Sequence, residues 1–153
     1  IPMALAYTAR GDLALHTAAV MIDGGAVLLA APSRFGKTTL AMAFAERGYE
    51  VLSEDLIGID VASTSVRPGP AIIRLRPDVY SGTPPAGWQE VAARPDRVFL
   101  SPPVGQRGSG AARALKAIVL LREGSEIRLS RASPIETVKD LWALNFRLPT
   151  NED

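Results

Sequence analysis

The sequence contains no cysteine, and this absence excludes disulfide bonds and thiolate metal sites. A charge excess is also lacking: 17 basic and 16 acidic residues leave a net charge of +1, which argues against nucleic acid or an anionic membrane surface as a partner. No apolar run approaches the roughly 20 residues of a membrane span. The opening residues, Ile1 to Ala6, lack the basic leader of a signal peptide. We therefore expect a cytoplasmic protein that binds neither nucleic acid nor membrane.

Hydrophobic residues make up 47% of the chain, which is typical of a globular protein with a sizeable core. A length of 153 residues fits one domain, so we interpret residues 1–153 as a single domain. The first residue is not Met, which leaves open that the sequence is part of a longer chain. Pro, Gly and Arg without periodicity predict a mobile loop over about residues 81–114, interrupted by a short strand near Arg97 to Leu100.

The stretch from Ala30 to Thr39 carries the clearest chemical signal. An apolar run, Ala26 to Ala31, predicts a buried strand, and the segment from about Thr38 to Arg47 predicts a helix that ends at Gly48. Between strand and helix lies a Gly-Lys-Thr-Thr sequence, in the context of a phosphate-binding P-loop. The usual pattern is G-x-x-x-x-G-K-[ST], and here Ala31 stands in place of the first glycine. Alanine is compatible with a P-loop if the backbone at that position does not need a positive φ. The alternative is a chance Gly-Lys-Thr at a helix start.

In a P-loop, backbone N–H groups and the positive end of the helix point at an anion. Lys37 adds a point charge for the outer phosphates, the Thr38 hydroxyl is placed to hold Mg²⁺, and Gly36 lets the backbone approach a phosphate. We therefore expect a site for nucleotide phosphates and magnesium. Its candidate residues are Ser33, Arg34, Phe35, Gly36, Lys37, Thr38 and Thr39.

Glu54 and Asp55 directly follow a predicted short strand, Tyr49 to Ser53, about one strand–helix–strand unit after the P-loop lysine. P-loop enzymes place a metal-linked acid in this position, so we favour a metal or base role over a solvated turn pair. His16 lies within a predicted apolar strand, Leu13 to Ile22, where a buried structural histidine is the alternative to a site role. Three arginines either reach a phosphate or are merely exposed: Arg97, Arg107 and Arg113.

Further strands and one more helix are predicted on either side of this region. The turn Asp23-Gly24-Gly25 predicts a hairpin whose second strand delivers the P-loop. Near the C-terminus, Leu115 to Leu121 predicts a buried strand and Glu126 to Ser130 a partner strand. Ser133-Pro134-Ile135-Glu136 is a capping box that begins a helix running to about Phe146. The side chains expected in the core from this helix are Ile135, Val138, Leu141, Trp142 and Phe146.

Three segments together resemble HPr kinase/phosphorylase and the nucleotide core of phosphoenolpyruvate carboxykinase: Leu15-His16, Phe35-Gly36-Lys37-Thr38-Thr39-Leu40 and Leu52-Ser53-Glu54-Asp55. The stretch Pro70 to Asp78 and the closing Asn145-Phe146 look like HPr-kinase-related proteins encoded with lasso-peptide and other peptide-modifying clusters. The resemblance implies an α/β fold of the P-loop phosphoenolpyruvate carboxykinase-like type (HPr kinase C-terminal domain-like), with a mixed sheet and few helices.

The resemblance also implies an ATP- and Mg²⁺-dependent kinase that transfers the γ-phosphoryl group to a serine hydroxyl of a peptide or protein, with lasso-peptide tailoring as the role in that subgroup. Glu54, assisted by His16, would be the general base, Thr38 and Asp55 would serve Mg²⁺, and Lys37 would act on the phosphates. The family usually has Asp-Asp at the acid pair. A Glu54→Asp variant is therefore expected to be at least as active, and Asp55 is a second candidate for the base.

Two other functions stay open. One is a nucleotide-binding regulatory module with weakened catalysis, which Ala31 and Glu54 favour, and the other is a small-molecule kinase. The sequence has no Glu-Val-Arg-Gly-Leu-Gly stretch, the signature of true HPr kinases, and so does not support the reverse phosphorylase activity. The choice among ATP, GTP and pyrophosphate is also open, as is a homo-oligomeric state.

Overall fold

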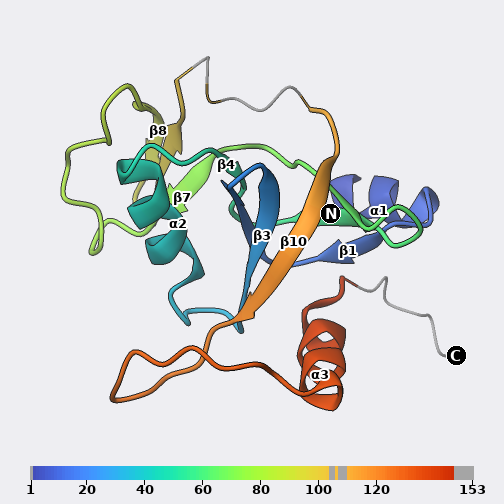
Figure 1. The fold of residues 1–153 in the computed structure, drawn as a ribbon. Helices are drawn as coiled ribbons and strands as arrows, with labels where there is room; N and C mark the ends of the chain where they lie inside the picture. Colours follow the sequence, from blue (N-terminus) through green and yellow to red (C-terminus); the bar gives the residue numbers. More distant parts are fainter. Residues whose placement is uncertain (1, 104–105, 107–109, 147–153) are drawn as a thin grey trace, which may run out of the picture.

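The computed structural model describes residues 2–103, 106 and 110–146, and this described part contains three helices and ten strands (Figure 1). The helices are α1 (Pro2–Ala9), α2 (Lys37–Glu46) and α3 (Pro134–Leu144). The strands are β1 (Leu13–Leu15), β2 (Ala18–Ile22), β3 (Gly25–Ala30), β4 (Val51–Ser53), β5 (Ile57–Asp60), β6 (Ser65–Arg67), β7 (Ile73–Leu75), β8 (Gln89–Arg94), β9 (Arg97–Ser101) and β10 (Arg113–Leu120). The expected α/β class with few helices is confirmed.

Seven strands form the larger sheet, in the order β1-β5-β6-β10-β3-β2-β4. β10 and β3 pair in parallel and the other neighbours pair antiparallel, so the sheet is mixed, as expected. The predicted hairpin is confirmed, because β2 pairs with β3 and places Ala18 opposite Leu29. Asp23 and Gly24 form its two-residue turn, and both have a positive φ, 47° and 79°, as a type I′ turn requires.

A second sheet has three antiparallel strands in the order β7-β9-β8, and β7 packs against α2 (Figure 1). This sheet corrects one expectation. Residues 81–114 were expected to form a loop with one short strand, whereas the described part of this stretch contains β8, β9 and the start of β10. Pairing with β9 stabilises β8, a strand that the local sequence does not reveal. The strand expected near Arg97 to Leu100 is confirmed as β9, whereas Arg107 lies outside the described residues.

The larger sheet carries a hydrophobic cluster on each face, because successive side chains of a strand point to opposite sides. In β3, Val27 and Leu29 join the cluster that α2 covers, and Ala26 and Leu28 join the other. Leu141 of α3 packs against this second cluster. The strand that leads into the P-loop is therefore buried on both faces, as its continuous apolar run predicts.

α1 was not predicted from the sequence, and its Tyr7 ring packs against β5. Gly58 of β5 permits this contact, since a Cβ at that position would lie 2.5 Å from the ring. The Tyr7 hydroxyl also donates a hydrogen bond to the carbonyl of Pro68, at 3.2 Å. In the part of the chain that the structure describes, none of the helices has the length and apolar character that a membrane span requires.

The region around β10 departs from the sequence-based expectations. β10 forms where a strand was predicted, but its side chains are half-buried or exposed rather than buried. The partner strand expected at Glu126 to Ser130 does not form. Residues 121–133 instead run without helix or strand, project away from the sheet and return to the start of α3 (Figure 1). Alternating polar and apolar residues favour a strand only where a neighbouring strand is available to pair with them.

α3 begins at the predicted capping box, in which Ser133 and Glu136 exchange hydrogen bonds. Its predicted core face is wrong for three side chains, since Ile135, Val138 and Trp142 are 70%, 66% and 63% exposed. Leu144 is buried instead, while Leu141 and Phe146 are partly buried as expected. Helical periodicity identifies an apolar stripe but does not say which side of the helix meets the core.

Candidate functional site

The direction of the strands brings three candidate groups to one edge of the larger sheet. β2 runs antiparallel to both β3 and β4, so β3 and β4 run in the same direction and end at the same edge. The P-loop follows the end of β3, Glu54 and Asp55 follow the end of β4, and His16 lies just before the start of β2. The Thr17 hydroxyl donates to the carbonyl of Leu29 at 2.7 Å and joins β2 to β3 at this edge.

The loop between β3 and α2 has the backbone conformation of an anion site. Gly36 is the N-cap of α2, with a φ of 84° that strains any residue carrying a side chain. No side chain caps this helix, so its first N–H groups are available to an anion. Arg34 also has a positive φ, 69°, whereas Ala31 does not. Alanine is therefore tolerated where the usual motif has its first glycine.

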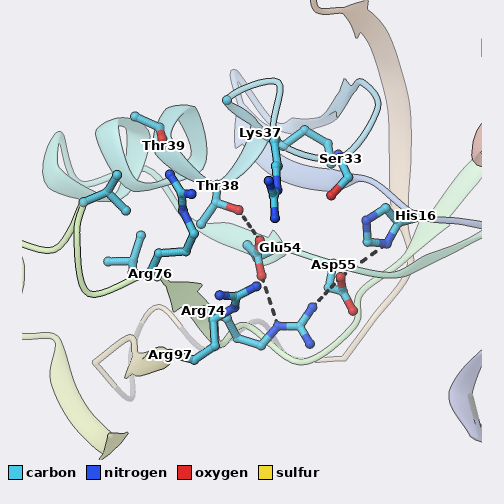
Figure 2. Close-up of a pocket in the computed structure, with 14 residues that line it drawn as sticks. His16, Ser33, Lys37, Thr38, Thr39, Glu54, Asp55, Arg74, Arg76 and Arg97 are labelled. Atoms are coloured by element: carbon cyan, nitrogen blue, oxygen red, sulfur yellow. Dashed lines mark hydrogen bonds and ion pairs between the residues drawn. The ribbon is translucent and has the colours of Figure 1, made fainter. Parts of the chain in front are cut away.

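Lys37 is the buried cation of the site, with 7% of its surface exposed. Its Nζ donates hydrogen bonds to the carbonyls of Ala31, at 2.6 Å, and Pro32, at 3.0 Å. Burial lowers the pKa of Lys37, and the nearby carboxylates of Glu54 and Asp55 oppose this shift. The ammonium group points from the loop toward the acid pair (Figure 2). A phosphate between them would meet a positive charge that is already partly desolvated, which strengthens the interaction.

Glu54 is also buried, with 7% of its surface exposed, and its Oε1 accepts a short hydrogen bond from the Thr38 hydroxyl (Figure 2). This contact joins the start of α2 to the residue that follows β4. The resemblance paired Thr38 with Asp55 as magnesium ligands, but the structure brings Glu54 to the Thr38 hydroxyl. The longer side chain of Glu54 therefore has a contact of its own, which a shorter acid would not reach in the same backbone position.

Asp55 faces different partners. The Nδ1 atom of His16 lies 3.3 Å from Oδ1 of Asp55, and Arg74 forms an ion pair with the same oxygen. The Nε atom of Arg74 also lies 3.4 Å from Oε2 of Glu54, so one guanidinium joins both acids (Figure 2). Burial, the largest influence, lowers the pKa of Arg74, but the two carboxylates outweigh it and the pKa is raised. The His16 side chain is 46% exposed, which excludes a buried structural histidine.

These groups line a pocket of about 280 Å³. Its charged side chains are Arg34, Lys37, Arg74, Arg76 and Arg97 on the positive side and Glu54 and Asp55 on the negative side. With His16 neutral, five positive and two negative charges give +3, which favours a polyanion. The volume lies just below the roughly 300–1,000 Å³ of pockets that enclose a drug-sized ligand. The pocket therefore suits the phosphate chain of a nucleotide, with the base and ribose outside it.

Most of the predicted site residues meet in this pocket. The lining includes His16, Ser33, Arg34, Gly36, Lys37, Thr38, Thr39, Glu54 and Asp55. Among the loop residues predicted to bind phosphate, Phe35 is the one whose side chain is not part of the described lining, and it is 45% exposed. Arg97 lines the pocket, as one alternative predicted. Arg113 does not, and its Nη2 lies 3.9 Å from Oε1 of Glu50.

Arg74 and Arg76 were not predicted as site residues, although both line the pocket. The signal was present in the Arg-Leu-Arg sequence of β7 and the residue after it. Residues two apart on an extended chain point to the same side, so both guanidinium groups face one way while Leu75, 3% exposed, packs into the core. The sequence alone does not show that this side faces the P-loop, because β7 belongs to the other sheet.

The Thr38 hydroxyl and the Glu54 carboxylate are hard oxygen donors of the kind that Mg²⁺ prefers. Within the described residues, no group of three or more His, Asp or Glu side chains could hold a metal ion. A magnesium ion at Thr38 and Glu54 would thus need phosphate oxygens or water as its other ligands, which is its usual situation in nucleotide sites. The residues present therefore fit a magnesium ion that arrives with a nucleotide.

Comparisons with known proteins find similarity among solved structures. No family model matches the chain, and no curated protein matches it. Among solved structures, the HPr(Ser) kinase/phosphatase from Coxiella burnetii is similar, with a TM-score of 0.46 and 15% sequence identity over 80% of this chain and 71% of that chain. Values this low do not assign an activity, so the function has to be inferred from the side chains of the pocket.

Proposed function

We propose that this chain is an ATP-dependent kinase that transfers the γ-phosphoryl group to a hydroxyl, that of a serine in a peptide or protein. The observation that carries the proposal is the shared pocket, in which the P-loop and Lys37 lie opposite Glu54 and Asp55. A chance Gly-Lys-Thr at a helix start would not need a buried lysine, nor a buried acid bonded to the Thr38 hydroxyl.

In the proposed reaction the acceptor oxygen attacks the γ-phosphorus in line, and the bond from that phosphorus to the β–γ bridging oxygen breaks. The bridging oxygen keeps the electron pair and leaves as part of ADP, and the hydroxyl proton passes to a carboxylate. Asp55 suits this proton transfer better than Glu54, because its side chain is 41% exposed and lies beside His16. Glu54 is buried and already bonded to Thr38.

The remaining charged groups fit the needs of phosphoryl transfer. Magnesium, when bound, neutralises negative charge on the β- and γ-phosphates, and Thr38 and Glu54 would hold it. Lys37 and the N–H groups at the start of α2 would bind the phosphate oxygens. The arginines of the pocket would stabilise the charge that spreads over the transferred group; they are Arg34, Arg74, Arg76 and Arg97.

One feature near the pocket favours a peptide acceptor over a small molecule. β8 is an outer strand of the smaller sheet, and all six of its residues are exposed. An exposed outer strand offers N–H and C=O groups with which an extended peptide can pair. β8 pairs with β9, whose first residue, Arg97, lines the pocket. A peptide on β8 would thus join the sheet whose other strands supply Arg74 and Arg97 to the pocket, and lasso-peptide precursors, which the resemblance suggested, belong to this substrate class.

The proposal is tested by incubating the protein with ATP labelled at the γ-phosphate, Mg²⁺ and a panel of acceptors: serine-containing peptides, free serine and sugars. We expect label on a peptide serine, and a loss of about 100- to 1,000-fold in Lys37→Ala, the range for removing one preorganised charge-stabilising donor. Lys116→Ala is the matched control, because that lysine is 49% exposed and pairs with Asp23 away from the pocket. It should keep full activity.

The other outcomes separate the alternatives. Nucleotide binding that depends on Lys37, without transfer to any acceptor, would indicate a regulatory module rather than a kinase. Transfer to free serine or a sugar, but to no peptide, would indicate a small-molecule kinase. Nucleotide binding that is equal in the wild type and in Lys37→Ala would remove the P-loop assignment altogether.

A further inference from the structure

We propose that Thr17 and Ser53 are positioning residues that hold His16 and Asp55 together through two buried hydroxyl groups. Neither residue lines the pocket, and each lies one or two positions away in sequence from the side chain that it positions. The inference rests on the proposed function, in which Asp55 takes the proton of the acceptor hydroxyl beside His16. It adds which groups of the fold keep this pair in place.

His16 and Asp55 lie on two short connections between distant strands of the larger sheet. Residues 16–17 join β1 to β2 and residues 54–56 join β4 to β5, although each pair of strands is five positions apart in the sheet order. Five positions in a flat sheet would span about 24 Å, whereas connections of these lengths reach at most about 11 and 14 Å. The sheet therefore has to curl until its two ends meet at these connections. β10 lies at the middle of the curl, since its first two residues pair with β6 and those from Leu115 onward pair with β3.

Thr17 fixes the connection that carries His16. The residue is fully buried, and its hydroxyl donates hydrogen bonds to the carbonyls of Leu29, at 2.7 Å, and Ala18, at 3.2 Å. The backbone N–H of Thr17 donates to the carbonyl of Leu15 at 3.1 Å, which closes a tight turn around His16. The His16 side chain is left outside this turn, 46% exposed and in the lining of the pocket. Loss of the hydroxyl would therefore loosen the turn that directs the imidazole.

Ser53 fixes the connection that carries Asp55. The residue is 1% exposed, and its hydroxyl donates to the carbonyl of Leu56 at 2.8 Å, which closes the chain over Glu54 and Asp55. Gly69 packs against this hydrogen bond, since a Cβ there would lie 2.5 Å from the Leu56 oxygen and 2.7 Å from Oγ of Ser53. The close packing shields the bond from water, which raises the cost of leaving the Leu56 carbonyl without its donor.

Both connections have to be in place for His16 to meet Asp55. The Nδ1 atom of His16 lies 3.3 Å from Oδ1 of Asp55 (Figure 2). In a neutral imidazole, the nitrogen that faces a carboxylate carries the ring proton, because two facing lone pairs would repel each other. We therefore expect His16 in its Nδ1–H form. A displacement of either connection by about 1 Å would weaken the contact, and such misplacement costs on the order of 100-fold in rate.

The first test is NMR of the imidazole, which is unambiguous because the chain has a single histidine. The ¹⁵N chemical shifts of the ring identify the protonated nitrogen, measured at about pH 9 in the neutral form. We expect mainly the Nδ1–H form in the wild type, and a change to Nε2–H in at least about half of the molecules of Thr17→Val and of Ser53→Ala. Asp55→Ala gives the reference value for a lost contact.

Two matched controls should keep the form seen in the wild type. Thr17→Ser retains the hydroxyl, and Ser101→Ala removes the hydroxyl of a serine that is also buried, 8% exposed, but lies in β9 of the smaller sheet. A thermal melt shows which variants fold. If either hydroxyl-deletion variant does not fold, Gly69→Ala replaces it, because this change keeps both hydroxyls and sets a Cβ against the Ser53–Leu56 hydrogen bond.

Kinetics with labelled ATP and a peptide acceptor separate positioning from nucleotide binding. In Thr17→Val and Ser53→Ala we expect kcat to fall about 10- to 100-fold, while KM for ATP changes by less than about twofold, because neither residue lines the pocket. A wild type that transfers no phosphoryl group would reject the proposed function and leave the NMR comparison to decide the positioning. A wild type in the Nε2–H form, or variants that keep both its ring form and its kcat, would overturn the inference.

Discussion

The contact between Thr38 and Glu54 leads to a prediction opposite to the one that the family resemblance suggests. The enzymes that the sequence resembles usually have an aspartate where this chain has Glu54, so the resemblance predicts that Glu54→Asp keeps or raises activity. In the structure, however, the Glu54 carboxylate is buried and accepts a hydrogen bond from the Thr38 hydroxyl. We expect Glu54→Asp to lower kcat/KM, because the shorter side chain withdraws the carboxylate from that hydroxyl.

Two estimates of the size of this loss agree. Removing one methylene shifts the carboxylate by about one C–C bond length, roughly 1.5 Å, and a misplacement of about 1 Å costs on the order of 100-fold in rate. A hydrogen bond to a charged group contributes about 1.5–3 kcal/mol. At about 1.4 kcal/mol per tenfold, that corresponds to a factor of about 10–150. A loss near 100-fold is therefore expected.

The assay measures ADP release in the presence of ATP and the peptide acceptor, and kcat/KM is determined over a series of Mg²⁺ concentrations. Glu46→Asp serves as the control, since it makes the same chemical change at an exposed position at the end of α2. A thermal melt of each variant separates a loss of activity from a loss of folding. Activity of Glu54→Asp at or above that of the wild type would refute the reasoning.

A double-mutant cycle with Thr38→Ala locates the effect at this contact. If the hydroxyl and the carboxylate act together, the two losses will not add, and the combined variant will be little worse than the poorer single one. Additive losses would mean that Glu54 acts through some other group, for which Arg74 is the available partner.

Two further predictions concern Arg74 and Tyr7. Arg74→Gln should lower the Mg²⁺ concentration that half-saturates nucleotide binding, because the guanidinium no longer competes with Mg²⁺ for the two acids. The expected change is up to about fivefold, the range for partly exposed ion pairs. An unchanged or higher Mg²⁺ requirement in a magnesium titration would contradict this. Burial raises the pKa of Tyr7 above its ordinary value of 10.0, with help from Asp12 and opposed by Arg67 and Arg10. The native state thus favours the neutral phenol, whose contribution to stability is fully present below about pH 10 and is lost as the pH rises through the raised pKa. Melting temperatures at about pH 8 and pH 11 should fall less in Tyr7→Phe than in the wild type, and an equal fall would exclude Tyr7 as the cause.

Much of the site could be predicted because the sequence patterns that specify it involve residues close to one another in the chain. The buried strand, the Gly-Lys-Thr-Thr loop and the helix follow each other within about 20 residues, and each has a local physical cause. The left-handed conformation of Gly36 and the capping box at Ser133 are likewise set by neighbouring residues. Local signals did not predict that His16 and Glu54 lie beside the P-loop. That prediction came from the family resemblance, which connects segments that are distant in sequence.

The partners of the two acids depend on the tertiary structure. Glu54 and Asp55 are adjacent in sequence, and either was compatible with a magnesium or a base role. Their side chains leave the end of β4 in different directions, and only the packing of β4 beside β2 sends Glu54 to Thr38 and Asp55 to His16. Arg74 reaches both acids because β7, in a separate sheet, packs against α2.

By itself, then, the sequence determined the chemical identity of the P-loop and the elements that flank it, because turn, cap and periodicity signals act over a few residues. The tertiary structure decided which acid meets which partner, which arginines enter the pocket and which side of α3 is buried. These depend on strand order and packing between segments far apart in the chain. The contact of the Tyr7 ring with Gly58 likewise depends on tertiary packing, because no local sequence pattern predicts a contact between residues 51 positions apart.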